Sequence, residues 1–236
     1  MTGNSTNKVG ISIIIPLLNE ELYVEKCIKI LHQHILGRNT EIIFIDGGSE
    51  DKSILLIENF SHHKLIKSKP GRAIQMNLGA KEARYPILYF LHIDSIPPKG
   101  FDQIIEEQIN NGIKAGCFLM RFEPSHWALS ITSFFTRFNW KICRGGDQSL
   151  FIEKTLFEEM KGFNEHYPIC EDNEFTDRLY QSGNFKVVDR VLISSSRRFN
   201  KNGVLFLLFL HGIIHLMRFL GVSPIQLNRF YRHFVK

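Results

Sequence analysis

Several features that define common protein classes are missing from this sequence. Its four cysteines are scattered and form no C-x-x-C pair, which excludes a zinc ribbon and suggests no disulfide framework. The first ten residues are polar and lack the apolar segment of a secretory signal. We therefore expect a protein of the reducing cytosol.

Two nucleotide-binding motifs and any strongly basic tract are also absent. No G-x-x-x-x-G-K-[ST] occurs, which excludes a P-loop nucleotidase, and the glycines at 47–48 do not form a G-x-G-x-x-G fingerprint. The 29 lysines and arginines exceed the 24 acids by only five, and no dense basic run of the kind that binds nucleic acid is present. We expect no nucleic-acid partner. The small excess suits an anionic ligand or a membrane surface.

What the sequence does contain favours one packed α/β domain. Its 236 residues are 44% hydrophobic and 22% charged, which is usual for a globular protein. Apolar strands alternate with helices through short connections, and this order predicts βαβ units in a doubly wound sheet. The expected strands are 9–15, 40–45, 64–67, 87–91, 115–122 and 149–152, and the expected helices are 19–37, 51–60, 72–83, 102–111 and 171–181.

Polar side chains follow three of the expected strands at their carboxyl ends, where doubly wound sheets bind ligands. Asn19 and Glu20 follow the first strand, and Asn19 is expected to cap the next helix. Asp46 follows the second strand, where it can hold a base or ribose or act only as a turn acid. Asp94 follows the fourth strand, where it can bind a divalent cation or cap a helix.

Residues near two predicted helix N-termini extend this pattern. Arg72 lies where a helix begins, and such a position is a ready site for an anion such as a diphosphate; a solvated basic turn is the alternative. Asp172 lies in the first turn of the helix 171–181, where the helix dipole stabilises a carboxylate. Gln75 and Asn77 are expected only to solvate the outer face of their helix.

An ordered series of segments gives the sequence a family resemblance. The segments are IIIPLLNEE at 13–21, IDGGSED at 45–51, GRAIQMNLGA at 71–80, LHIDS at 91–95, GDQ at 146–148, CEDNE at 170–174, SSRRF at 195–199 and KNGV at 201–204. In this order they resemble the family 2 glycosyltransferases with the GT-A fold, and in particular their short, single-domain bacterial branch with G-R-A-x-Q-M-N and F-L-H-x-D segments.

The resemblance implies an α/β fold: a GT-A-type doubly wound mixed sheet flanked by helices, in a single domain with a C-terminal helical extension. We expect a flexible N-terminus at 1–8 and a glycosyltransferase domain at 9–200. Within that domain, 9–95 would bind the nucleotide and 96–200 the acceptor. Residues 201–236 would form a helical segment, docked on the domain or peripheral on a membrane.

The resemblance also implies roles for individual residues. Asp172 matches the general base of inverting members. Asp147, Gln148 and Glu171 are expected to bind the acceptor, although Asp147 fits a simple turn almost as well. The residues implied at the nucleotide-sugar site are Pro16, Asn19, Glu20, Asp46, Arg72, His92, Asp94 and Arg198.

The expected metal site departs from the family pattern. Its D-x-D segment reads His92-Ile93-Asp94, so that only the second acid is present. We expect Mn²⁺ or Mg²⁺ as the cofactor, bound by Asp94 and by His92, because imidazole can ligate Mn²⁺ whereas Mg²⁺ prefers oxygen. For His92, direct donation to a phosphate and simple packing at the strand end are the alternatives.

The second half of the chain is rich in aromatic residues and ends in an apolar stretch. The segment 127–140 is expected to pack in the core, although an apolar wall would also suit a lipid acceptor. Residues 203–222 are apolar except at His211, His215 and Arg218, and these interruptions argue against a transmembrane span. Docking on the domain is expected first, with contact at the inner face of the membrane as the alternative.

Taken with the resemblance, these observations predict an inverting glycosyltransferase of the cytoplasm. It would move a sugar from a nucleotide-sugar donor, expected to be UDP-linked, to a hydroxyl acceptor such as a lipid or a small hydrophobic molecule. Asp172 would take the proton of the acceptor. Two alternatives remain: a sugar nucleotidyltransferase, whose glycine-rich, lysine-containing loop is missing here, and a non-catalytic, membrane-associated module that binds nucleotide sugars.

Overall fold

A computed structural model describes residues 10–60, 62–145, 148–183 and 185–235. The strands are β1 Ile11–Leu17, β2 Thr40–Asp46, β3 Lys64–Lys67, β4 Ile87–Phe90, β5 Ala115–Glu123, β6 Leu150–Glu153 and β7 Phe185–Ser195. The helices are α1 Glu21–His34, α2 Ser53–Glu58, α3 Arg72–Glu82, α4 Phe101–Asn110, α5 Trp127–Phe135, α6 Lys154–Glu159, α7 Glu171–Ser182, α8 Arg197–Asn202, α9 Val204–Phe219 and α10 Pro224–Phe234, with a short 3₁₀ helix η1 at Lys141–Cys143.

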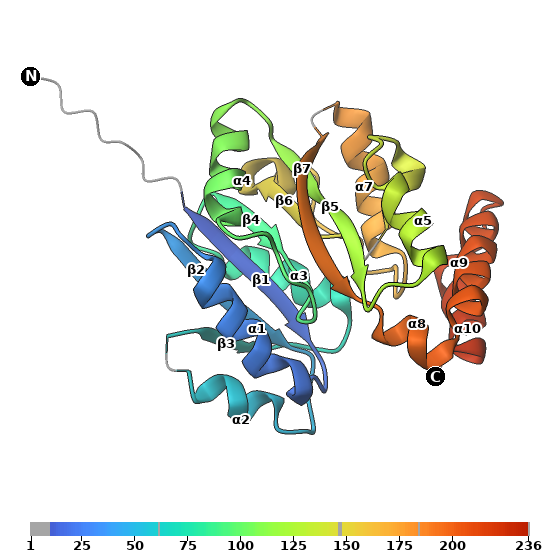
Figure 1. Cartoon of the computed structure of the whole chain (residues 1–236), viewed down its shortest axis with the longest axis horizontal. Coiled ribbons are helices and arrows are strands. Elements are labelled where there is room, and N and C mark those ends of the chain that lie inside the picture. The colour runs from blue at the N-terminus through green and yellow to red at the C-terminus, as the bar shows by residue number, and fades with distance from the viewer. Residues whose placement is uncertain (1–9, 61, 146–147, 184, 236) are drawn as a thin grey trace, which may run out of the picture.

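The strands form one mixed sheet with helices on both faces (Figure 1). Its order is β3-β2-β1-β4-β6-β5-β7. Strand β6 runs antiparallel to both β4 and β5, and the other neighbouring strands are parallel. This architecture confirms the predicted doubly wound mixed sheet flanked by helices.

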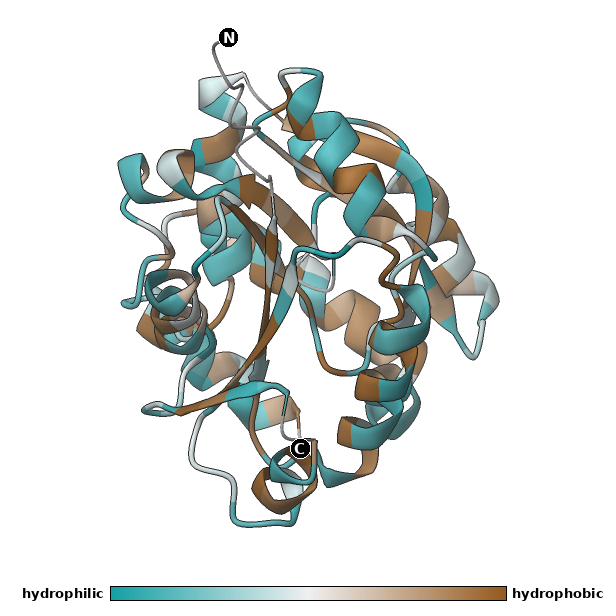
Figure 2. Cartoon of the chain, turned by 90° about the vertical axis from the view of Figure 1, so that its left-hand side faces the viewer, coloured by the Kyte–Doolittle hydropathy of each residue, from teal (hydrophilic) through white to brown (hydrophobic). Residues whose placement is uncertain are grey.

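Strand β1 lies inside the sheet because its run of isoleucines is buried on both faces. It pairs with β2 on one side and β4 on the other, so both of its faces are covered. Ile13 and Ile15 contribute to one hydrophobic cluster, and Ile14 contributes to the cluster on the opposite face. Figure 2 shows the result as hydrophobic strands between helices with hydrophilic outer surfaces. Each such buried side chain contributes roughly 1.5–3 kcal/mol of transfer free energy.

Helix α3 is held against the ends of β1 and β2 by a buried amide. Gln75 donates from Nε2 to the carbonyl oxygens of Leu17 at 2.9 Å and Ile45 at 2.7 Å. Asn77 exchanges two hydrogen bonds with the backbone of Phe163. The expectation that Gln75 and Asn77 only solvate the helix is therefore wrong, because both side chains satisfy backbone groups of neighbouring segments.

The start of α1 differs from the prediction. Asn19 has a left-handed φ of 55° and accepts a hydrogen bond from the backbone N–H of Glu50, so it ties two loops together instead of capping the helix. Glu20 occupies the N-cap position, and its side chain makes no capping hydrogen bond. Its carboxylate is engaged elsewhere, as described below.

Strand β7 was not predicted, and its irregularity explains why. Its pairing with β5 shifts register between Phe118 and Leu119, which pair with Val188 and Val191. Asp189 and Arg190 occupy the bulge and are exposed, so they interrupt the alternation by which a strand is recognised. The strand matters for function because α8 begins directly after it.

The C-terminal helices pack against β5, α5 and α8. Leu207, Leu210 and Ile214 of α9 and Leu227 of α10 are buried in a cluster with residues of β5, α5 and α8. Along the described part of the chain, no helix combines the length and the apolarity needed to cross a membrane.

The aromatic stretch 127–140 is only partly in the core. Leu129 of α5 is buried, whereas Trp127, Phe134 and Trp140 leave about half or more of their surface exposed. The expectation of core packing is therefore wrong for these three side chains, which lie on the outer side of the helix and of the segment after it.

Candidate active site

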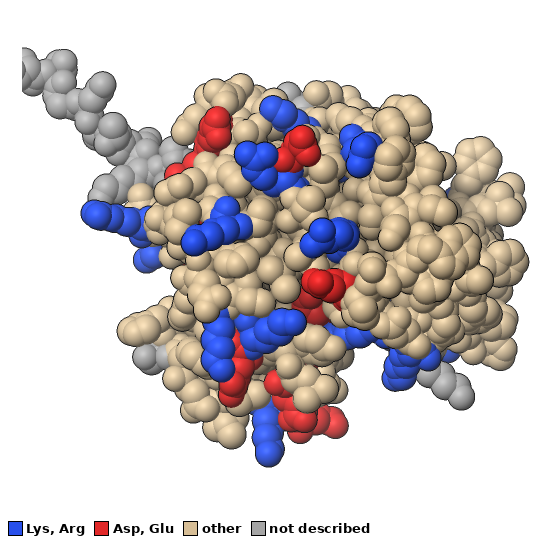
Figure 3. All heavy atoms as spheres, viewed as in Figure 1, with Lys and Arg blue, Asp and Glu red and all other residues tan. Residues whose placement is uncertain are grey.

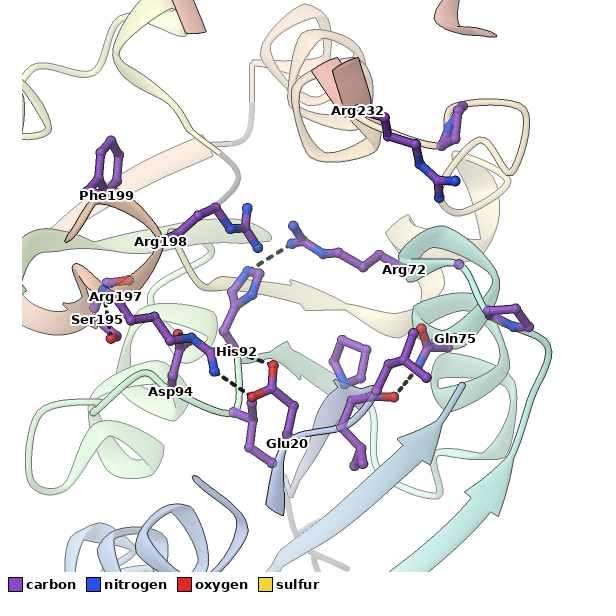
Figure 4. A pocket seen from close by; sticks show the side chains of 18 of the residues that line it. Glu20, Arg72, Gln75, His92, Asp94, Ser195, Arg197, Arg198, Phe199 and Arg232 are labelled. Atoms are coloured by element: carbon purple, nitrogen blue, oxygen red, sulfur yellow. Dashed lines mark hydrogen bonds and ion pairs between the residues drawn. The ribbon is translucent and has the colours of Figure 1, made fainter. Parts of the chain in front are cut away.

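A cavity of about 440 Å³ lies beyond the carboxyl ends of β1 and β4, at the sheet edge where the sequence predicts ligand binding (Figure 4). Its wall is completed by the start of α3, by the junction of β7 with α8, and by side chains of α9 and α10. Polar and charged groups that line it are Glu20, Arg72, Gln75, His92, Asp94, Ser194, Ser195, Arg197, Arg198, His211 and Arg232.

The structure brings together six of the eight residues expected at the nucleotide-sugar site. Pro16, Glu20, Arg72, His92, Asp94 and Arg198 all line this cavity, although they come from four separate parts of the sequence. Their proximity follows from the topology, because β1 and β4 are adjacent parallel strands and both end at this edge.

On one side of the cavity, Arg197 joins two carboxylates. Its Nη1 and Nη2 each lie 2.6 Å from an oxygen of Glu20, and its Nε lies 2.8 Å from Oδ2 of Asp94. Burial opposes the charged guanidinium, but the hydrogen bonds to Glu20 and the charge of Asp94 outweigh it and raise the pKa of Arg197. A fixed positive charge thus lies against the carboxylate that was expected to bind the metal.

On the other side, Arg72 joins a histidine to two further carboxylates. Its Nη2 lies 2.9 Å from Nε2 of His92 and 2.9 Å from Oδ2 of Asp172, and its Nε lies 3.1 Å from Oε1 of Glu171. A guanidinium can only donate, so His92 Nε2 is the acceptor in this arrangement. The contact with Glu171 is an ion pair and not a well-aligned hydrogen bond.

A second cavity of about 470 Å³ adjoins the first. Asp172 and Glu171 line it at the start of α7, and Arg72, Arg198, His211 and Arg232 line both cavities. Figure 4 shows Arg72, Arg198 and Arg232 reaching into the shared region from α3, α8 and α10. The wall of the second cavity also contains apolar groups, namely Ile169, Ile214 and Val235.

Asp46 and Asn19 are not among the residues that line either cavity. Asp46 is buried, and its carboxylate accepts hydrogen bonds from the backbone N–H of Gly48 at 3.0 Å and of Ser49 at 3.1 Å. This is the turn role that the sequence left open. Asn19 is exposed and bonded to the loop at 49–50.

The remaining acceptor residues are placed less directly. Gln148 is buried beside a small separate pocket that Asp172 also lines, and its Oε1 lies 3.4 Å from the backbone N–H of Gly145. Asp147 lies outside the described residues.

The two expected metal ligands are both engaged by arginines. Asp94 contacts Arg197, and His92 accepts from Arg72. Across the segments that the structure describes, no three His, Cys, Asp or Glu side chains are arranged to hold a metal ion together. A carboxylate such as Asp94 is nonetheless the hard ligand that Mg²⁺ or Mn²⁺ takes.

Three site residues escaped the sequence reasoning. Arg197 was passed over in favour of its neighbour Arg198, although the Arg-Arg doublet was visible. His211 of α9 was predicted only as a polar interruption of the apolar C-terminal stretch, and Arg232 of α10 was assigned no role. Both side chains line the cavities because α9 and α10 pack beside them.

Comparison with known proteins gives the family. The model for "Glycosyl transferase family 2" matches residues 12–145. An uncharacterized glycosyltransferase of Haemophilus influenzae is 35% identical over 107 residues, which cover 42% of this chain and 41% of that protein. A dolichyl N-acetyl-alpha-D-glucosaminyl phosphate 3-beta-D-2,3-diacetamido-2,3-dideoxy-beta-D-glucuronosyltransferase of Methanococcus voltae is 31% identical over 99 residues, 39% of this chain and 31% of that protein. The matches therefore span less than half of these relatives.

Solved structures share the fold. S. aureus TarS 1-349 in complex with UDP superposes with a TM-score of 0.66 at 15% identity, over 79% of this chain and 60% of that one. The mannosyltransferase PcManGT from Pyrobaculum calidifontis, in complex with GDP-Man and Mn²⁺, gives 0.61 at 15% identity, over 80% and 57%. The family match covers more than half of the sequence, and the chain belongs to glycosyl transferase family 2.

Proposed function

We propose that this protein is an inverting glycosyltransferase that moves a sugar from a nucleotide-sugar donor to a hydroxyl acceptor. The observation that carries the proposal is the position of Asp172. Its carboxylate lines the second cavity, while its partner Arg72 lines both cavities. A carboxylate that could accept a proton and a group of cations that could bind phosphates therefore lie side by side.

The first cavity is the proposed donor site. Pro16 and Glu20 would contact the nucleotide, and Arg72, Arg198 and Arg232 supply positive charge where the two cavities meet. Such charge would stabilise the diphosphate as the bond to the sugar breaks. We propose UDP as the nucleotide, supported by the TarS structures with UDP and UDP-GlcNAc; GDP is the competing choice, supported by PcManGT with GDP-Man. Asp46 and Asn19 would act indirectly, by shaping the loops beside this end.

A divalent cation fits the donor site if the side chain of Arg197 moves away from Asp94. Asp94 would hold Mn²⁺ or Mg²⁺, and His92 would be a second ligand for Mn²⁺ once Arg72 turns to the phosphates. When bound, the metal would neutralise charge on the diphosphate. The presence of Mn²⁺ in the PcManGT complex supports this proposal.

The second cavity is the proposed acceptor site. Asp172 would take the proton of the attacking hydroxyl, and general-base catalysis of this kind is worth roughly 10²–10⁴-fold in rate. A single displacement by that hydroxyl inverts the configuration at the sugar carbon. The mixture of arginines with Ile214 and Val235 suits an acceptor with both a polar and an apolar part. Glu171, Gln148 and Asp147 remain proposed acceptor residues.

We also propose a division of the chain into a catalytic domain at 9–200 and a helical segment at 201–236 that completes the site. The segment's contribution is supported by His211 and Arg232, which line both cavities from α9 and α10.

The test is to incubate the purified protein with UDP- and GDP-linked sugars, with Mn²⁺ or with a chelator, and to measure free nucleotide release and donor binding by calorimetry. We expect one nucleotide sugar to bind and to be slowly hydrolysed. Pyrophosphate release from a nucleoside triphosphate and a sugar phosphate would instead identify a nucleotidyltransferase. Binding without any turnover, with acceptors present, would favour the non-catalytic module.

A further inference from the structure

Large apolar side chains are exposed together on one side of the molecule. They come from α5, from the segment around η1 and from α9, and we refer to them as the apolar face. Helices α5 and α9 contact each other, and Asp177 of α7 joins η1 to α9 by pairing with Lys141 and with Arg218. Six members, each between 58% and 89% exposed, are Trp127, Trp140, Ile142, Phe209, Phe219 and Leu220.

The segments that form this face contain no acidic residues. Residues 124–146 hold three lysines and arginines and no Asp or Glu, and residues 197–236 hold seven and none. Of these seven, Arg197, Arg198 and Arg232 line the first cavity, and Arg218 pairs with Asp177. Lys201 and Arg229 are exposed. Arg137 lies over the ring of Phe134, with its guanidinium carbon 4.1 Å from the ring centre.

The surface view agrees with this distribution. In Figure 3 the area over α5 and α9 is almost entirely uncharged, and Lys and Arg side chains appear beside it near the C-terminal end. An uncharged apolar area with positive charge at its edge has the composition of surfaces that lie in a lipid headgroup layer.

We propose that the apolar face docks on an anionic lipid bilayer. Aromatic and aliphatic side chains would enter the interface, and the exposed cations Arg137, Lys201 and Arg229 would pair with lipid phosphates. Helix α9 has 16 residues and carries Arg218 near its end, so it fits a position along the surface and not across the bilayer. A second copy of the chain is a poor occupant, because it would bring the same exposed cations and, from these segments, no acidic residue to pair with them.

Docking in this way would bring the active site to the membrane. Helix α9 contributes Phe209 and Phe219 to the apolar face, and α9 and its neighbour α10 supply His211 and Arg232 to both cavities. An acceptor with a lipid part could then reach the second cavity from the bilayer. This last step rests on the proposed function, whereas the docking itself does not.

Tryptophan fluorescence gives a direct test, because the chain has two tryptophans and both belong to the apolar face. The full chain is mixed with vesicles of phosphatidylglycerol and phosphatidylcholine, or of phosphatidylcholine alone. We expect a blue shift of the emission, quenching by brominated lipid, and co-sedimentation with the anionic vesicles that is weakened at 0.5 M salt, as expected for screened charges. Unchanged emission and protein left in the supernatant would overturn the proposal.

Two double variants distinguish binding through the apolar face from non-specific hydrophobic binding. Phe209→Ser with Phe219→Ser removes two exposed rings, and we expect at least a tenfold loss of vesicle affinity with unchanged UDP binding. The matched control is Leu22→Ser with Leu55→Ser on α1 and α2, where the side chains are 82% and 57% exposed. Equal loss in both double variants would contradict the proposal.

Two further outcomes are distinguishable. A concentration-dependent dimer with blue-shifted emission in the absence of lipid would assign the face to a second copy and overturn lipid docking. If no nucleotide sugar binds but the vesicle results hold, the proposed function fails and the docking proposal stands.

Discussion

The Nε of Arg197 lies 2.8 Å from Oδ2 of Asp94, the carboxylate that the sequence assigns to a divalent metal. Arg197 also holds both carboxylate oxygens of Glu20. The positive charge that a metal would bring is thus already supplied by a side chain. Metal binding and this ion pair compete for Asp94, and the competition can be measured.

We therefore predict that Arg197→Ala strengthens Mn²⁺ binding while lowering stability. Without the guanidinium, Glu20 and Asp94 repel each other, and a divalent cation would relieve that repulsion. The rise in Tm on adding Mn²⁺ should be larger in this variant than in the wild type. Arg190→Ala, at an exposed position on β7, is the control and should behave like the wild type. A smaller Mn²⁺ effect in Arg197→Ala would mean that Asp94 is not a metal ligand.

The proposed base makes the second prediction. Asp172→Asn keeps the size of the side chain but cannot accept a proton, so transfer should fall by roughly 10²–10⁴-fold. Donor binding should change only a few fold, because Arg72 and the other arginines remain. Steady-state kinetics and calorimetry measure the two effects separately. Asp189→Asn, exposed on β7, is the matched control, and wild-type turnover in Asp172→Asn would remove that residue from the role.

The sequence predicted the central sheet well because its signal is local. The run from Ile11 to Ile15 can only be buried on both faces, and the strand at 64–67 has the bounds that the pattern indicated. Strand β7 has no such pattern, because Asp189 and Arg190 occupy a bulge that exists only opposite β5.

The site residues that directly follow strands could be predicted from the sequence. Where two adjacent residues were equally plausible, only the tertiary structure shows which one makes a given contact. Asp94 and His92 follow β4 and reach the cavity as expected. Which of Arg197 and Arg198 contacts Asp94 depends on the turn from β7 into α8, and no local pattern fixes it. The exposure of Trp127 likewise depends on which side of α5 meets α9.

A third prediction concerns the buried amide that anchors α3. Gln75→Leu would remove the side-chain donor from the carbonyl oxygens of Leu17 and Ile45, although the Leu17 oxygen would keep the backbone N–H of Gly47. Loss of a buried hydrogen-bond partner costs about 1–3 kcal/mol, so chemical denaturation should show a loss of that order. Gln103→Leu, at an exposed position of α4, should change stability by less than about 0.5 kcal/mol. Equal stability of the two variants would show that the bonds contribute nothing.

The last prediction is a loss of stability in acid that originates at His63. Burial, followed by the nearby charges of His32 and His62, lowers the pKa of His63 from 6.5 to about 4. The neutral ring lies 3.2 Å from His32, Nε2 to Nε2, and packs edge-on against Phe44. Below pH 6.5 the unfolded chain binds a proton at this position and the folded chain does not, so the free energy of unfolding falls until the pH reaches about 4.

His63→Gln removes this titration, so its Tm should fall less than that of the wild type between pH 7.5 and 4.5. Carboxylate titrations are common to both proteins and cancel in the comparison. His166→Gln, which alters an exposed histidine, should keep the wild-type slope. If His63→Gln loses stability as steeply as the wild type, the acid sensitivity arises elsewhere, and His63 must protonate in the folded protein without disturbing the contact with His32.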